Sequence, residues 1–185
     1  MDANKLNNNV ILKYFAYIDK LVLTLGETFS WLNFFVLITI ILQLILTHFF
    51  GKGYIFIDEL EWHFYAIAFL LGLSYTEVKD RNIRIDVFSQ KFSTQTKEKI
   101  DIFGNIFLIL PYVIIVFIHG IDFAHEAWII GETSGSPMGL PYRWFIKSFI
   151  PIGVFFLGIS VISRTIKSIV FLTRNSNYKD SHRGA

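Results

Sequence analysis

The chain has 185 residues, of which 53% are hydrophobic and 17% are charged, with 20 Phe and no Cys. A net charge of +2 gives no reason to expect nucleic acid as a partner, and the lack of Cys excludes disulfides and thiolate metal sites. Four long stretches contain no Asp, Glu, Lys or Arg, which excludes a soluble, a disordered or a disulfide-rich secreted domain and predicts an all-α integral membrane protein. The charged residues that bound these stretches are Glu27 and Lys52, Glu61 and Glu77, Asp101 and Asp122, and Lys147 and Arg164.

Each charge-free stretch predicts one transmembrane helix, because about 20 residues at about 1.5 Å each cross the hydrocarbon core of a bilayer. The four predicted spans cover residues 30–50, 59–76, 102–121 and 141–163. They form a single membrane domain over residues 10–173. The polar ends, residues 1–9 and 174–185, are expected to be flexible cytoplasmic tails.

Two further segments are predicted to be short amphipathic helices that lie on the membrane surface. Residues 10–25 are apolar but include Lys13, Asp19 and Lys20, and the sequence leaves open that they form a short fifth span. In residues 83–92, Ile83, Val87 and Phe88 fall on one helical face.

Lys and Arg are unevenly distributed among the loops, which predicts the orientation in the membrane. Six of them lie between Lys79 and Asp101 and five in the segment that begins at Arg164, whereas the loop after the first span carries only Lys52. Both termini and the 79–101 loop are therefore expected in the cytoplasm.

Few ionisable residues lie within the predicted spans, and Lys147 is the clearest of them. It lies about one turn inside the outer end of the fourth span, so its ammonium either reaches the interface or pairs with Glu132, Glu126 or Asp122. Glu59 and Glu61 begin the second span at its outer end, where an acid is favoured by the helix dipole and either could also contact a partner.

On the cytoplasmic side, Arg81, Arg84 and Asp86 follow the second span. They either set the topology and bind anionic lipid head groups, or pair with each other or with a neighbour. Pro111 and Pro151 lie in the middle of the third and fourth spans, and each should kink its helix and shape the packing.

Histidines offer one alternative function. His48, His63 and His119 all fall near the outer ends of their spans, with His125 just beyond, and paired histidines in a helical bundle can ligate haem iron. No motif typical of a hydrolase, a metalloprotease or a phosphate-binding loop occurs, so the chain is not expected to be an enzyme or to need a cofactor. These patterns favour a small membrane subunit that holds a partner.

Three stretches resemble a known family. The first is Glu59-Leu60-Glu61-Trp62-His63-Phe64, which leads into Gly72. The second runs from Lys79 to Phe88 and includes Arg81; it matches at Arg84 and Asp86, although Asn82 stands where a His is usual. The third contains Glu132, Ser134, Trp144, Lys147 and Pro151. In this order they resemble the small membrane subunit, of the DctQ type, of tripartite ATP-independent periplasmic (TRAP) transporters, over about residues 20–170.

The resemblance implies a non-enzymatic scaffold subunit of a Na⁺-coupled importer of organic acids in the bacterial inner membrane. Its partners would be a large membrane subunit that moves the substrate and a periplasmic solute-binding protein that docks transiently. The residues named in the three stretches would hold partners or the subunit's own shape. A haem-bearing electron-transfer subunit and a free-standing membrane assembly factor are the alternatives.

Overall fold

Helices make up most of the structure, a computed structural model that describes the backbone of residues 3–80 and 92–183 and the side chains of residues 12–80 and 92–174. No strand occurs in these ranges. The elements in chain order are α1 (Ala3–Ser30), α2 (Leu32–Phe50), α3 (Ile55–Val78), α5 (Thr94–Gly104), the π-helical turn η1 (Asn105–Ile109), α6 (Leu110–Ile129) and α7 (Arg143–Arg183).

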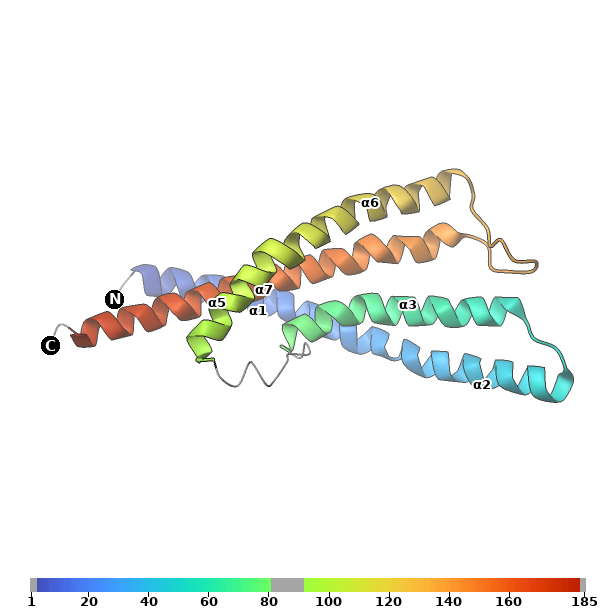
Figure 1. The fold of residues 1–185 in the computed structure, drawn as a ribbon, viewed down its shortest axis with the longest axis horizontal. Coiled ribbons are helices and arrows are strands. Elements are labelled where there is room, and N and C mark those ends of the chain that lie inside the picture. Colours follow the sequence, from blue (N-terminus) through green and yellow to red (C-terminus); the bar gives the residue numbers. More distant parts are fainter. Residues whose placement is uncertain (1–2, 81–91, 184–185) are drawn as a thin grey trace.

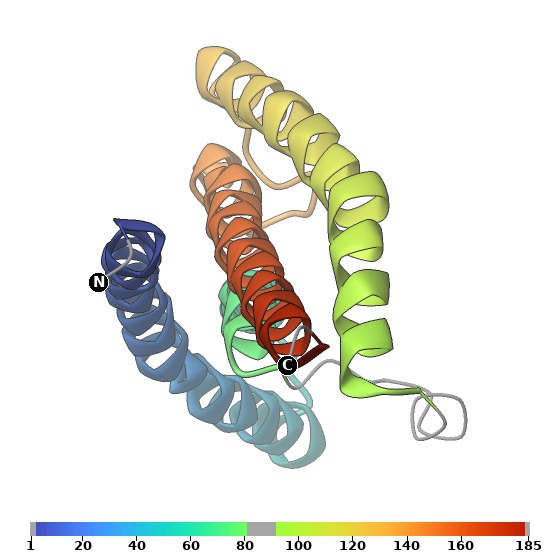
Figure 2. The same ribbon diagram turned by 90° about the vertical axis from the view of Figure 1, so that its left-hand side faces the viewer.

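The helices form two hairpins that lie side by side (Figure 1). Helices α2 and α3 turn at residues 51–54, and α6 and α7 are joined by a longer loop, residues 130–142. Both ends of the chain lie at the opposite end of the molecule from these two turns. Helix α3 packs against α1, α2 and α7, while α6 packs against α7, so α2 and α6 flank a curved row with α3 and α7 between them (Figure 2).

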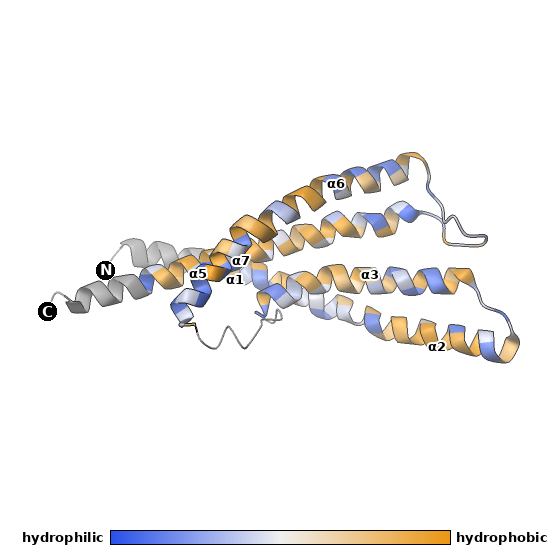
Figure 3. Cartoon of the chain, in the orientation of Figure 1, coloured by the Kyte–Doolittle hydropathy of each residue, from blue (hydrophilic) through white to orange (hydrophobic). Residues whose placement is uncertain are grey.

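Within the described residues, three segments are long and apolar enough to cross a membrane: Leu12–Phe50, Thr94–Ile129 and Arg143–Arg174. They contain the first and third predicted spans and nearly all of the fourth. Helix α3 covers the second predicted span but is more polar, with acids at both ends and His63 between them (Figure 3). The all-helical membrane class is thus supported, and a fourth span in α3 stays a prediction.

Helices extend further at the termini than the sequence suggested. Residues 10–25 belong to α1, which runs almost directly into α2 with one non-helical residue, Trp31, between them. Val22 of this segment is buried, and α1 packs against α3 and α7, so part of its surface faces protein. Whether it also lies on the membrane surface stays a prediction. The backbone is helical from Ala3 and as far as Arg183; the predicted surface helix at 83–92 falls, except for Phe92, outside the described residues.

The two predicted kink residues lie in different helices: Pro111 in the first turn of α6, and Pro151 inside α7. Pro111 cannot donate a backbone hydrogen bond, and it lies two residues after the end of the π-helical turn that interrupts the path from α5 into α6. Figure 2 shows this path bending. Pro151 is buried inside α7, next to Gly120 of α6: a Cβ on Gly120 would lie 3.3 Å from the Pro151 Cδ. Pro151 thus lies in the contact between α7 and α6, whereas Pro111 is exposed, and a kink caused by either proline stays a prediction.

Close packing between α3 and α7 depends on Gly153, which gives the first testable prediction. A Cβ at Gly153 would lie 2.8 Å from the Leu70 Cβ and 3.1 Å from the Leu70 carbonyl oxygen, whereas a Cβ at Gly72 would meet nothing within 4 Å. We expect Gly153→Ala to lower the free energy of unfolding by roughly 1–3 kcal/mol because the helices must separate. Gly72→Ala should be neutral or stabilising by up to about 1 kcal/mol. Chemical denaturation in mild detergent measures both; equal effects would contradict the packing.

Candidate functional site at the ends of the helices

The loop between α6 and α7, residues 130–142, is called the outer loop after the predicted orientation, and Glu59 connects it to α3. One carboxylate oxygen of Glu59 accepts a hydrogen bond from the Ser134 hydroxyl, and the other accepts one from the backbone N–H of Leu140 at 2.5 Å. The N–H of Ser134 donates in turn to the Leu140 carbonyl at 3.1 Å. Charge-assisted hydrogen bonds of this kind are among the stronger ones in proteins. Glu59 therefore joins the two hairpins at the end of the molecule away from the termini.

Lys147 forms an ion pair with Glu132, which is the partner among the three acids that the sequence offered. The Lys147 Nζ also lies 3.7 Å from the centre of the Phe123 ring, within the range of a cation–π contact. The side chains of Lys147 and Glu132 are only 15% and 23% exposed, so the pair is largely shielded from solvent. The pair fastens the start of the loop to the second turn of α7.

Aromatic packing reinforces the same loop, while other predicted residues lie apart from it. The rings of Trp144 and Trp128 meet edge to face with their centres 4.5 Å apart. Glu61 is half-buried and Trp62 is exposed and packs edgewise on Tyr65. The structure thus brings together Glu59 with Ser134, Lys147 with Glu132, and Trp144 with Trp128. It leaves Glu61, Trp62 and Pro151 outside this cluster, and Arg81, Arg84 and Asp86 lie outside the described residues.

The four histidines whose side chains the structure describes are not gathered into one site. The Nδ1 of His63 lies 2.5 Å from the Glu59 carbonyl oxygen, one turn earlier in α3. His48, His119 and His125 are exposed on α2 and α6. Within the part of the chain that the structure describes, no group of three metal-ligating side chains is placed to hold a metal ion.

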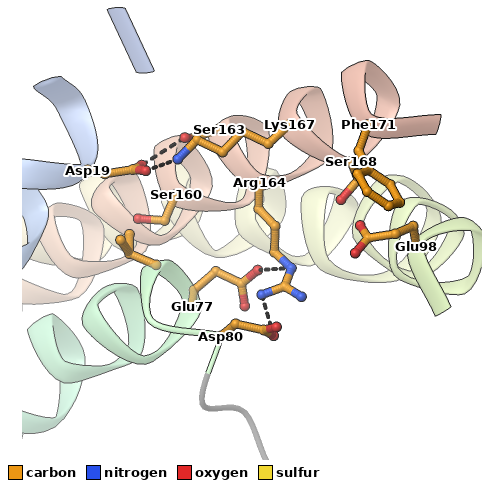
Figure 4. Close-up of a pocket in the computed structure, with 11 residues that line it drawn as sticks. Asp19, Glu77, Asp80, Glu98, Ser160, Ser163, Arg164, Lys167, Ser168 and Phe171 are labelled. Carbon is orange, nitrogen blue, oxygen red and sulfur yellow. Dashed lines mark hydrogen bonds and ion pairs between the residues drawn. The ribbon is translucent and has the colours of Figure 1, made fainter. Parts of the chain in front are cut away.

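A second polar cluster, called the inner cluster after the predicted orientation, lies at the end of the helices nearer the termini, and Arg164 of α7 is its centre (Figure 4). Its guanidinium lies 2.5 Å from Asp80, 2.9 Å from Asp101 and 3.7 Å from Glu77. Glu77 belongs to α3, Asp80 to the turn after it and Asp101 to α5. One largely buried side chain, 16% exposed, therefore connects α7 to α3 and α5.

Asp19 adds α1 to this inner cluster. Its carboxylate forms an ion pair with Lys167 and accepts a hydrogen bond of 2.7 Å from the Ser163 hydroxyl, both on α7 (Figure 4). On the α5 side, the Asn105 side-chain amide donates a buried hydrogen bond of 3.1 Å to the Thr165 hydroxyl. Helix α7 is thereby joined through polar contacts to α1, α3 and α5.

The sequence interpretation used Arg164 and Lys167 as topology signals and did not predict their partners. A signal was present, since Glu77, Asp101 and Arg164 each stand at the edge of a charge-free stretch. These edges fall on the same side of the predicted membrane, so their charges are expected to meet there. Arg143 and Arg164 are 21 positions apart in one helix, about 31 Å and close to the hydrocarbon thickness of a bilayer. The two clusters thus lie at the two ends of an apolar layer.

Glu59 gives a prediction for the outer loop. Replacing it by Gln removes one of the two carboxylate acceptors and the charge, so the Leu140 amide loses its strong partner. We expect the Leu140 amide of Glu59→Gln to exchange its hydrogen about tenfold faster, since such a bond contributes about 1.5–3 kcal/mol. Hydrogen exchange with mass spectrometry measures this. Glu61→Gln is the matched control and should leave the loop unchanged; the same rate in both variants would contradict the tie.

Apolar helices with charged groups collected at their two ends define the chain as a small helical membrane protein. The family model described as "Tripartite ATP-independent periplasmic transporters, DctQ component" matches residues 36–170, and the chain belongs to this family. It is therefore the small membrane component of a TRAP transporter, as the sequence resemblance predicted. No curated protein matches the chain. Members of this family work with a large TRAP membrane subunit and a solute-binding protein.

Proposed function

We propose that the chain is the scaffold subunit of a Na⁺-coupled importer of organic acids, located in the bacterial inner membrane. In this role it packs against the large transport subunit and stabilises it, while substrate recognition belongs to the partners. The observation that carries the proposal is the family match over residues 36–170, which includes all of α3 and α6.

The outward surface of the flanking helices supports a role in holding another membrane protein. Helix α2 buries only Thr39 within the chain, and large apolar residues are exposed along it. Helix α6 buries only Val113, Gly120 and Ala127. Without a hydrophobic driving force in lipid, such faces associate through close packing with another helix or remain in contact with acyl chains. Ion pairs at both ends of the bundle connect α7 to the loop at residues 130–142 and to α3 and α5, while α2 packs against α3 and α6 packs against α7.

The proposed topology has four spans, with α3 as the second, and both termini in the cytoplasm. The antiparallel course of α2 and α3 and the placement of both chain ends at one end of the molecule support it. In this topology Glu59, Glu132, Ser134, Trp144 and Lys147 keep the outer loop in shape where the solute-binding protein docks transiently. Arg81, Arg84 and Asp86 lie on the cytoplasmic side, near anionic lipids.

Uptake measured in whole cells tests the proposed function. Cells that express the large subunit and the solute-binding protein should take up a labelled organic acid only when this chain is also present and a Na⁺ gradient is imposed. Collapse of the Na⁺ gradient should abolish the uptake. Unchanged uptake after deletion of the chain's gene would contradict a required scaffold role, and uptake that ignores Na⁺ would contradict the coupling.

A further inference from the structure

A pocket of about 280 Å³ lies beside the inner cluster. It is lined by residues of four helices and is open to solvent on one side (Figure 4). One stripe of α7 forms its floor, because residues three and four positions apart lie on one face of a helix. This stripe is Ser160, Ser163, Arg164, Lys167, Ser168 and Phe171. Helices α1, α3 and α5 supply the walls through Asp19, Glu77 and Glu98. The position at the inner ends of the helices distinguishes it from the outer loop.

The pocket has one side whose polar groups have no partners in the described chain. Glu98 makes no ion pair or hydrogen bond there. Ser168 is 5% exposed, and its hydroxyl also makes no hydrogen bond to a described residue. Every polar side-chain atom that is fully shielded from solvent in the described residues has a hydrogen-bond partner. Because the Ser168 hydroxyl has no such partner, it is accessible to solvent, and it opens onto the pocket that Ser168 lines. Figure 4 shows Ser168, Glu98 and the Phe171 ring grouped together.

This group of side chains suits an ammonium ion. A carboxylate and a hydroxyl accept its N–H donors, and the face of an aromatic ring attracts its charge. A carboxylate–ammonium hydrogen bond is also one of the stronger polar contacts when it is partly shielded from water. Glu98, Ser168 and Phe171 supply one of each kind.

The neighbouring Lys167 makes the pocket suitable for a zwitterion. Its ammonium has three N–H donors, one of which is directed to Asp19, and its side chain is 39% exposed. The remaining donors can bind an anionic oxygen on the open side of the pocket. A ligand with an ammonium beside a phosphate would therefore meet a charge of opposite sign at both of its ends.

The depth of the pocket favours a lipid as the source of this zwitterion. Arg164 lies about 31 Å along α7 from Arg143, which is about the hydrocarbon thickness, and Phe171 lies about 10 Å further. The unpaired side of the pocket is thus at the level of the lipid head groups. Ile100, Phe103 and Phe107 are exposed on the α5–η1 segment that packs against α7, and they offer an apolar surface for acyl chains.

We propose that this pocket binds the head group of a phospholipid that carries a primary ammonium, as in phosphatidylethanolamine. Glu98, Ser168 and Phe171 bind the ammonium, and Lys167 binds the phosphate. The site goes beyond the proposed function, since it requires neither transport nor a partner subunit. Its role is to fix the inner end of the subunit in the bilayer leaflet.

Native mass spectrometry of the purified full chain in mild detergent tests the proposal. Phosphatidylethanolamine is added and compared with phosphatidylglycerol, which lacks the ammonium, and with phosphatidylcholine, whose ammonium has no N–H donor. We expect phosphatidylethanolamine to be retained most. Glu98→Gln should lower its retention about tenfold, the equivalent of losing one charge-assisted hydrogen bond. Ser168→Ala should lower it less, and Glu27→Gln, an exposed acid on α1 outside the pocket, should have no effect.

Three results would overturn the proposal. Equal retention of the three lipids would show that the head group is not recognised, and unchanged retention in both Glu98→Gln and Ser168→Ala would place binding elsewhere. If Glu98→Gln weakens the complex with the large subunit while lipid retention stays constant, a basic side chain of that protein occupies the pocket. Thermal unfolding of each variant separates these results from misfolding, and Glu98→Gln should unfold at the wild-type temperature because Glu98 has no partner within the described chain.

Discussion

Replacing Arg164 by methionine should lower the free energy of unfolding by roughly 3–5 kcal/mol, the range for breaking a buried ion pair from one side. The substitution keeps much of the side-chain volume but removes the guanidinium that contacts Glu77, Asp80 and Asp101. Three acids from two helices and a turn would then lie close together without this counter-charge. Chemical denaturation of the purified chain in mild detergent measures the change.

The matched control for Arg164→Met is Lys99→Met, because Lys99 is an exposed cation on the adjacent α5. It should change the free energy of unfolding by no more than about 0.5 kcal/mol. Arg164→Lys should fall between the two, since a single ammonium keeps the charge but cannot reproduce the fork of the guanidinium. An Arg164→Met variant as stable as Lys99→Met would remove the inner cluster as a stabilising feature.

Replacing Lys147 by methionine is the second substitution with a large expected effect, roughly 2–4 kcal/mol of unfolding free energy. The reason is that Glu132 would keep its charge in a largely shielded position, without the ammonium and without the contact between Lys147 and Phe123. Denaturation in detergent again measures the loss. Because the outer loop begins at this pair, faster proteolysis within residues 130–142 should accompany it.

A double substitution tests whether the pair itself is responsible. In Lys147→Met combined with Glu132→Gln no unpaired charge remains, so part of the stability lost in the single variant should return. Lys52→Met changes an exposed cation at the same end of the molecule and should be nearly neutral. Additive effects of the two single substitutions would show that Lys147 and Glu132 are not coupled.

The charge pattern predicted most of the membrane-crossing architecture because burial in lipid excludes unpaired charges over a full helix length. Predicted spans at 30–50 and 102–121 lie inside the candidate spans of the structure, and that at 141–163 overlaps the third almost completely. The long α1 was predicted less well, since Lys13, Asp19 and Lys20 interrupt its apolar pattern. Asp19 proves to be paired with Lys167 from the other end of the chain, a contact that local sequence does not reveal.

The outer cluster was partly predictable for a similar reason. An ammonium within a predicted span needs an anionic partner or access to the interface, so Lys147 pointed to the three nearby acids. The choice of Glu132 depends on the loop, in which Gly131 adopts a positive φ of 59° two residues after the end of α6. The hydrogen bonds of Glu59 to residues 134 and 140 likewise depend on that loop's fold. Such turns are set by tertiary contacts and not by the apolar pattern.

The two clusters would hold the row of helices in one arrangement, as the proposed scaffold role requires. Helix α7 carries both Lys147 and Arg164, so it is fixed to the loop at one end and to α3 and α5 at the other. The apolar faces of α2 and α6 between these ends are left for lipid or for a partner. In the proposed role the subunit would contribute surface and shape to the transporter to which its family belongs.

Co-purification with the large TRAP subunit tests the central claim most directly. The tagged chain, expressed together with the large subunit and extracted in mild detergent, should carry the large subunit with it in equimolar amount through size-exclusion chromatography. Arg164→Met should lower the yield of the complex, and Lys99→Met should not. Clean separation of the two wild-type proteins, together with uptake that survives loss of this chain, would contradict the scaffold role.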